Sequence, residues 1–502
     1  MGERQFGLAG NQLRRALWNR YQGDAVEQEI IKMEANGFKI DVDFCDAQSK
    51  IATVDEAESL DKLRHWLAVV GVPPLAGCDL IWSSPKQMVT LLHDVLKYPP
   101  SPVWKKGRVK VERGERKTDQ AALEWIRGRV PKAHRGLIDE LIRLRRVRGC
   151  LKYLRKLPTF VAPDGFVHPV CGPAGDDDGH GVGTITGRLA GRNPEFQQIP
   201  TNPEKDWYRI RKAFVAPPGH HLIVADYSAL EVVILAHILI DLFGDHQLAE
   251  MCSPGAPDIH AVNARRVFDF LGWKVDGHPV RDYSIEDFKV VKGCKRLRQM
   301  IKEIWYGLMY GKGAFGFATS LRNENDEPIG EELAQKLVDA LLDSVPGIRK
   351  FHAWVWEFIH RYKGMVGIGG RWLNLKDLVE GDEWSRKKAS RIAQNFPCQE
   401  GGAFIVGAAM ISIGKDRLLA EEGLKTERQI HDEIDFRSPD EWSAPQPGWR
   451  PVYVQGLPKN EWAAAKIEWE KGLIEKHMVG CVSLHAPLQV TVGHGQTWND
   501  CK

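Results

Sequence analysis

The sequence predicts an α+β protein in which helices form most of the chain and a few strands carry the candidate chemistry. Long helix-like segments occupy residues 119–157 and 298–311, whereas residues 160–202 are dense in Gly, Pro, Asp and Asn and predict short strands with ordered loops. An apolar run at 222–225 predicts a buried strand. The 502 residues, of which 43% are hydrophobic and 27% charged, suffice for about two to four subdomains around a sizeable core.

Composition excludes several classes of protein. No apolar run approaches the roughly 18 to 20 residues that span a bilayer, and the first residues, MGERQFGLAG, lack a signal-peptide pattern. We therefore expect no membrane association and a cytoplasmic location, the host cytoplasm if the source is viral. Nine scattered cysteines without a CxxC pair predict reduced thiols and no zinc site.

The N-terminal half is predicted to be helical with interruptions. Residues 25–65 predict helical segments around a turn at Asn36-Gly37, and Ser83-Ser84-Pro85 opens another helix. Residues 98–119 predict a loop or short hairpin. The stretch 141–156 contains no acid and is strongly basic, with Arg143, Arg145, Arg146, Arg148, Lys152, Arg155 and Lys156. Such a stripe suits a phosphate backbone, although a solvated helix face is the alternative.

Acidic residues at two predicted strand ends are the first candidate site. Asp226 follows the strand at 222–225 and precedes a helix, so it is either a metal ligand or a helix N-cap. Asp432 and Glu433 lie between short apolar pieces, as at a hairpin tip, beside His431. Adjacent acids at a turn are usually only solvated, but this pair could meet Asp226 across a sheet. The three acids Asp176 to Asp178 sit in a Gly-flanked loop and predict a solvated turn.

Carboxylates that converge repel one another and are stable as anions only with cations between them. Two divalent ions held in this way activate an attacking hydroxyl and stabilise a leaving pyrophosphate, as in the two-metal sites of polymerases. The acids of the predicted sheet are therefore suited to phosphoryl or nucleotidyl transfer.

The helix at 298–311 carries Arg298, Lys302, Tyr306 and Tyr310 at four-residue steps. At about 100° and 1.5 Å per residue, these side chains form one slowly drifting stripe. The cations suit a triphosphate and the rings suit a base or sugar. A surface helix with two half-buried tyrosines is the alternative reading of the same spacing.

Five motifs occur in order along the chain: TGRLAGRNPEFQQIP at 186–200, DYSALE at 226–231, RLRQMIKEIWYGLMYG at 296–311, RIAQNFPCQE at 391–400 and HDE at 431–433. Together they resemble the family A DNA polymerases, the bacterial polymerase I group and its phage relatives. The resemblance runs from about residue 22 to the end of the sequence. It implies a right-hand fold with an antiparallel-sheet palm and helical fingers and thumb.

For catalysis, the resemblance implies two Mg²⁺ ions, with Mn²⁺ as a substitute. Asp226 and Asp432 would bind them with the carbonyl of Tyr227, and Glu433 would be auxiliary. Lys302 would protonate the leaving pyrophosphate.

For the nucleotide, the resemblance implies that Arg298, Lys302 and His260 hold the triphosphate. Tyr310 would flank the templating pair, and Glu231 would exclude a ribose 2′-hydroxyl. The primer-template would be contacted near its end, mostly from the minor groove, by Arg188, Arg391, Asn395, Gln399 and His431.

Two residues depart from the family pattern. Tyr306 stands where many members carry Phe, which predicts ready use of dideoxynucleotides. Trp305 replaces a small polar residue, so the packing of its helix needs explanation.

The resemblance divides the chain into an N-terminal extension at 1–21, a thumb at 22–165, a palm at 166–240 and 386–502, and fingers at 241–385. The basic stripe would then belong to the thumb and grip duplex phosphates. We expect a monomer that lacks 3′–5′ and 5′ nuclease domains and acts on primer-template DNA and dNTPs. A separate exonuclease or other replication proteins could serve as partners.

Two other functions compete with this one. A single-subunit RNA polymerase shares the helix spacing, but a 2′-hydroxyl gate at Glu231 serves no purpose in RNA synthesis. A catalytically inactive DNA-binding subunit would have no need for Asp226, Asp432 and Arg298 together.

Overall fold

A four-stranded antiparallel sheet lies at the centre of the computed structural model, which describes residues 12–72, 80–105, 108–172, 184–200, 206–309, 312–321, 329–443 and 457–501. The strand order is β12-β13-β7-β14, with bounds β7 (His220–Tyr227), β12 (Lys425–Ile430), β13 (Glu433–Pro439) and β14 (Val490–Gly495). The predicted strand, the predicted hairpin and the α+β class are therefore confirmed. The Asp176–Asp178 turn and Tyr310 lie outside the described residues.

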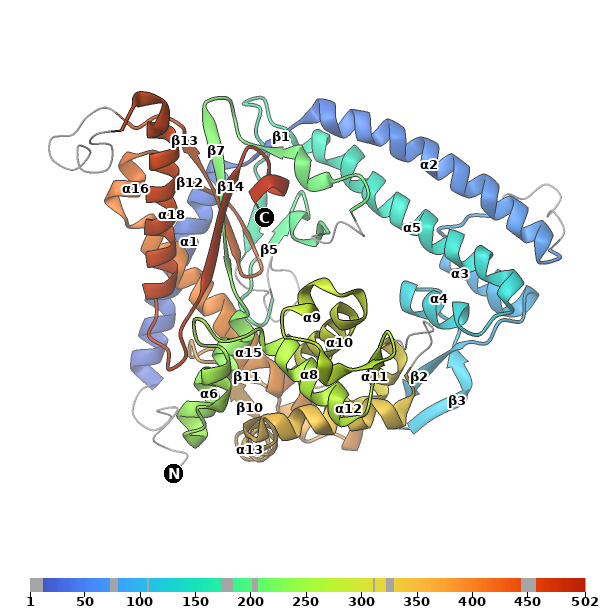
Figure 1. The fold of residues 1–502 in the computed structure, drawn as a ribbon. Coiled ribbons are helices and arrows are strands. Elements are labelled where there is room, and N and C mark those ends of the chain that lie inside the picture. The colour runs from blue at the N-terminus through green and yellow to red at the C-terminus, as the bar shows by residue number, and fades with distance from the viewer. Residues whose placement is uncertain are drawn as a thin grey trace.

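Helices pack around this sheet (Figure 1). The longer ones are α1 (Gln12–Asn36), α6 (Leu230–Phe243), α15 (Glu383–Gly414) and α18 (Trp462–Gly480), and the short α16 (Arg417–Glu421) follows α15. By length and composition α15 could cross a membrane, but 67% of its apolar window is buried inside the protein, as in a core helix. The boundary expected at residue 22 falls inside α1, which packs on α15 and β12.

A pair of long helices extends from the sheet and carries a second hydrophobic core (Figure 1). The pair consists of α2 (Val42–Val69) and α5 (Arg135–Lys156). At its far end lie α3 (Pro85–Val89), α4 (Gln120–Arg127) and a hairpin of β2 (Ser101–Lys105) and β3 (Arg108–Glu115). The hairpin is one of the two structures predicted for residues 98–119.

Two arginines of the basic stripe on α5 pair with neighbouring acids. Arg148 Nε lies 2.6 Å from Glu56 Oε1, and Arg143 lies 3.3 Å from both Glu58 and Glu140. Glu56 and Glu58 belong to α2, so packing brings in acids that residues 141–156 lack. Contact of the stripe with duplex phosphates stays a prediction.

Further helices form a third region, drawn below the helix pair in Figure 1. They are α8 (Ile259–Phe270), α9 (Asp287–Val290), α10 (Lys292–Met309), α11 (Ala314–Ser320), α12 (Glu331–Ser344) and α13 (Pro346–Tyr362). The predicted helix at 298–311 is α10, which packs against α8, α9 and α12. Small elements complete the fold: β1 (Lys39–Ile40) with β6 (Phe214–Val215), β4 (Val170–Gly172) with β5 (Ala190–Arg192), β8 (Lys274–Val275) with β9 (His278–Pro279), β10 (Gly364–Val366) with β11 (Trp372–Asn374), α7 (Gln247–Met251) and α14 (Lys376–Val379).

The buried carboxyl of Glu400 ties α15 to the turn between β10 and β11. Its side-chain oxygens accept from the backbone N–H groups of Gly369 at 3.0 Å and Arg371 at 3.4 Å. A Cβ atom at Gly367 would lie 1.9 Å from Glu400 Oε2, so this turn needs glycine to approach the carboxyl. Burial raises the pKa of Glu400 to about 7, although the two N–H groups oppose the shift.

We expect Glu400→Gln to flatten the pH dependence of stability. A carboxyl whose pKa is raised on folding binds its proton more tightly in the folded state, so stability falls as pH rises from about 4.5 to 7. The wild type should lose on the order of 2 kcal/mol across that window, and the Gln variant should lose clearly less. The melting temperature of both proteins between pH 4.5 and 8 measures this. Glu383→Gln, an exposed exchange on the same helix, should leave the slope unchanged.

Candidate active site

The register of the sheet brings the predicted acids together. Asp226 lies opposite Glu433 in the pairing of β7 with β13, and the backbone N–H of Tyr227 donates to the carbonyl of Asp432 at 3.1 Å. Directly opposed residues have side chains on one face, with Cβ atoms about 5 Å apart. His431 has a left-handed backbone, with φ of 56°, at the hairpin turn. Such strain in a non-glycine residue is maintained only where the surroundings enforce it.

The alternative role of Asp226 as a helix cap is excluded. The residue at the N-cap of α6 is Ala229, which has a left-handed backbone, and no side chain caps this helix. Asp226 is the next-to-last residue of β7, separated from α6 by a short turn. β7, an inner strand, therefore places the Asp226 carboxyl near its C-terminal end, beside the hairpin turn.

Asp432 is half-buried and lies close to two other carboxyl groups, those of Glu231 and Asp226. Its Oδ1 atom is buried without a hydrogen-bond partner in the described structure. Burial, with the nearby charges of Glu231 and Asp226, raises the pKa of Asp432 to about 6 against the opposing effect of Arg188. No cluster of three His, Cys, Asp or Glu side chains suited to a metal occurs in the described part of the chain. The carboxylates of Asp226 and Asp432 and the nearby backbone carbonyls nevertheless match the oxygen ligands that hard divalent cations prefer.

Glu231, in the first turn of α6, is held beside this site by an ion pair. Arg188 donates to Glu231 Oε1 at 2.6 Å, and the Glu231 side chain is only 6% exposed. Arg188 therefore connects the predicted sugar gate to the predicted primer contacts.

Arg298 and Tyr306 of α10 lie close to residues of α8 and its cap. Arg298 makes a forked pair with Asp258, at 3.1 Å from Nε and 2.6 Å from the terminal nitrogen. Asp258 also caps α8 by accepting from Ala261 N–H at 2.8 Å. The sequence reasoning missed Asp258, although it precedes the predicted His260 by two residues.

His260 is buried among these cations, and its ring lies 6.0 Å from that of Tyr306. Burial lowers the pKa of His260 to about 4, with Lys302 and Arg298 adding to the effect. The imidazole is therefore neutral near pH 7. Lys302 Nζ lies 6.0 Å from the Tyr306 ring centroid, so the predicted stripe exists as far as the described residues extend.

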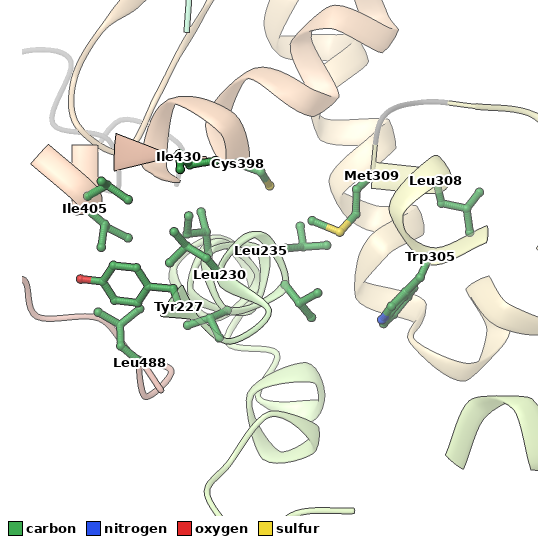
Figure 2. Close-up of a cluster of buried hydrophobic side chains, with 14 of the residues drawn as sticks. Tyr227, Leu230, Leu235, Trp305, Leu308, Met309, Cys398, Ile405, Ile430 and Leu488 are labelled. Carbon is green, nitrogen blue, oxygen red and sulfur yellow. The ribbon is translucent and has the colours of Figure 1, made fainter. Parts of the chain in front are cut away.

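Trp305 anchors α10 from its inner side. The indole is 1% exposed, and its N–H lacks a hydrogen-bond partner in the described structure. Figure 2 shows Trp305 and Met309 on one side of α6, with Tyr227 and Leu488 on the other. One continuous apolar core thus connects the end of β7 to α10.

Four of the five predicted DNA contacts line one cavity of 950 Å³. These residues are Arg188, Asn395, Gln399 and His431. Asn395 Oδ1 is buried there without a partner in the described structure. The fifth, Arg391, is exposed on α15 and is absent from the cavity lining.

Known proteins resemble this chain over most of its length. The sequence profile described as DNA polymerase family A matches residues 71–445. The DNA polymerase I of Deinococcus radiodurans is 29% identical over 472 residues, which cover 94% of this chain and 41% of the relative. The thermostable DNA polymerase I of Thermus filiformis is 29% identical over 479 residues, which cover 94% of this chain and 47% of the relative. The chain thus spans less than half the length of these relatives.

A solved structure has the same fold. The polymerase domain of Pol1 from M. smegmatis, in complex with DNA primer-template and dNTP, matches with a TM-score of 0.72 and 25% identity. The match covers 95% of this chain and 70% of that one. The predicted right-hand fold is therefore confirmed as the class of this protein. The chain belongs to the family A DNA polymerases.

We expect Asp432→Asn to stabilise the protein in the absence of divalent cations. The penalty for ionising Asp432 in the folded state develops between about pH 3.8 and 6 and is complete above pH 6. Above that pH, a neutral amide should raise the melting temperature by about 1 to 3 °C, whereas near pH 4 the two proteins should converge.

Asp416→Asn is the control, because it should act in the opposite direction. Asp416 caps a helix and pairs with His477, and its pKa is lowered despite burial, which opposes the shift. Thermal melts in EDTA compare the variants. A lower melting temperature for Asp432→Asn at pH 8 would contradict the proposed excess of charge.

Proposed function

We propose that the chain is a template-directed DNA polymerase that adds dNMPs to a primer 3′-hydroxyl. The observation that carries the proposal is the convergence of Asp226 and Asp432 at adjacent strand ends, joined through one core to the cations and rings of α10. Family membership supports it, as does the DNA and dNTP complex of the related Pol1 domain.

Divalent cations are the proposed cofactors, with two Mg²⁺ ions as the leading choice and Mn²⁺ as a substitute. Asp226, Asp432 and the carbonyl of Tyr227 would hold them, with Glu433 as an auxiliary. When bound, such ions lower the pKa of an attacking hydroxyl and stabilise a leaving pyrophosphate. The orphaned oxygen of Asp432 supports this assignment.

The nucleotide is proposed to lie along α10. Arg298 and Lys302 supply charge-assisted hydrogen bonds to the triphosphate, and neutral His260 supplies one more. Lys302 is the donor of a proton to the departing pyrophosphate. Tyr310 is proposed to flank the templating pair. Glu231, whose carboxylate is 6% exposed and paired with Arg188, is proposed to exclude a ribose 2′-hydroxyl.

Primer-template DNA is the proposed partner of the 950 Å³ cavity. Arg188, Asn395, Gln399 and His431 present donors and acceptors there that suit the minor groove, where contacts sense the shape of a base pair more than its sequence. Arg391 would act from the exposed face of α15. The expected monomeric state, the cytoplasmic location and a separate exonuclease stay predictions.

Primer extension tests the proposed function. The wild-type chain with Mg²⁺ should extend a primer with dNTPs and discriminate strongly against rNTPs. Asp432→Asn should reduce extension by at least about a thousandfold, because it removes one of two carboxylates at the reacting centre. Asp377→Asn, an exposed exchange on α14, is the matched control and should retain activity. Equal extension by Asp432→Asn and wild type would refute the metal assignment, and a preference for rNTPs would favour an RNA polymerase.

Tyr306→Phe tests the predicted use of dideoxynucleotides. The phenolic hydroxyl can replace the missing 3′-hydroxyl of a chain terminator, so its loss should raise discrimination against ddNTPs by roughly 10- to 100-fold. Incorporation of dNTPs should change only a few-fold. Competition between ddNTP and dNTP in single-nucleotide extension measures the ratio.

Tyr283→Phe is the control for this exchange. Its hydroxyl donates to the Val275 carbonyl, which holds a fingers loop and not the nucleotide. Unchanged terminator use by Tyr306→Phe, or an equal change in Tyr283→Phe, would count against the assignment.

A further inference from the structure

A turn after β14 reaches back beneath the proposed active site. This turn is η8 (Trp498–Cys501), and its first residue, Trp498, is fully buried. The indole N–H of Trp498 donates to Glu433 Oε1 at 2.8 Å. Glu433 is itself 3% exposed and lies opposite Asp226 in the sheet. One hydrogen bond therefore connects a distant segment to the auxiliary carboxylate.

Two guanidinium groups and a phenyl ring pack against the indole ring of Trp498. The Arg211 guanidinium lies 3.6 Å from the ring centroid, and that of Arg428 lies 4.9 Å away. The Phe214 ring meets the indole edge to face at 5.1 Å. Cation–π contacts are stronger where they are desolvated, as here, so the ring and its N–H are held in one direction.

The turn approaches closely because glycines on β14 make room for it. A Cβ atom at Gly493 would lie 1.8 Å from the carbonyl oxygen of Cys501, and one at Gly495 would lie 2.8 Å from Asp500 Cβ. The Thr497 hydroxyl donates to Asp500 Oδ2 at 2.7 Å and closes the turn. Glycines at 493 and 495 therefore let the turn that carries Trp498 pack directly against β14.

An ion pair lies next to Glu433 along β13. Asp435, two residues along the strand, is paired with Arg428 at 2.8 Å. Both members of that ion pair are buried. The guanidinium of Arg428 therefore touches the two groups that flank Glu433, namely Asp435 and the indole.

We propose that Trp498 is a positioning residue for the reaction and acts by fixing the Glu433 carboxylate next to Asp226 and Asp432. This inference rests on the proposed polymerase function. Removing the N–H frees one carboxylate oxygen beside the reacting centre without disturbing the groups that bind the nucleotide or DNA.

Trp498→Phe is the test, because it keeps an aromatic ring beside Arg211 and Arg428 and removes the donor. Single-turnover extension should show a maximal rate about tenfold lower, a size typical of outer-shell partners of a reacting carboxylate. The apparent dissociation constants for dNTP and primer-template should stay within about twofold. Trp442→Phe is the matched control: its indole donates to the Trp462 carbonyl at 3.0 Å, and its loss should leave the rate unchanged.

A double-mutant cycle separates positioning from general stability. In a Glu433→Ala background, the Trp498→Phe exchange should have no further effect on the rate, because its target is gone. Three outcomes overturn the proposal. The rate losses of Glu433→Ala and Trp498→Phe could multiply in the double variant, the rate of Trp498→Phe alone could be unchanged, or Trp442→Phe could lose as much as Trp498→Phe. A wild-type chain that does not extend primers overturns the proposed function, and this inference with it. An active wild type with an unaffected Trp498→Phe overturns this inference alone.

Discussion

The pairing of β7 with β13 in a single register is the constraint on which the proposed site depends. Side chains alternate along a strand, so a slip of one residue would turn Asp226 to the face now taken by Tyr227, whose hydroxyl donates to Met478 of α18. Ion pairs within the hairpin fix β13 in the same way against β12, its other neighbour. Arg428 lies directly across from its partner Asp435, and Arg437 reaches Glu427 at 2.7 Å.

Those ion pairs lie in the core, where their cost needs an explanation. Burying a charge pair costs as much desolvation as its attraction returns, so it is weak support for stability but strong support for one arrangement. The Arg428 guanidinium is surrounded by Phe38, Phe214 and Trp498, at 4.8 to 5.3 Å from the ring centroids. Apolar side chains of the same volume would fill this space and leave the orientation of the neighbouring carboxylates unspecified.

Local pattern predicted the parts of the site that lie on continuous segments. The apolar run before Asp226 and the pieces around Asp432 indicated strand and hairpin, and four-residue spacing indicated α10. The sequence did not indicate two contacts: Glu56 of α2 with Arg148, and Trp498 with Glu433. Each joins residues that are 65 or more positions apart. Periodicity carries no information about such pairings, since they are set by how whole elements pack.

Asp258 joins α8 and α10, the two helices of the proposed nucleotide site. Its carboxylate holds Arg298 on α10 by two charge-assisted bonds while capping α8, which also carries His260. Separating the helices would strand a half-buried carboxylate and a guanidinium, at a cost of several kcal/mol. Any movement of α10 that keeps this pair therefore carries α8 with it, and the side chains proposed to bind phosphate keep their mutual arrangement.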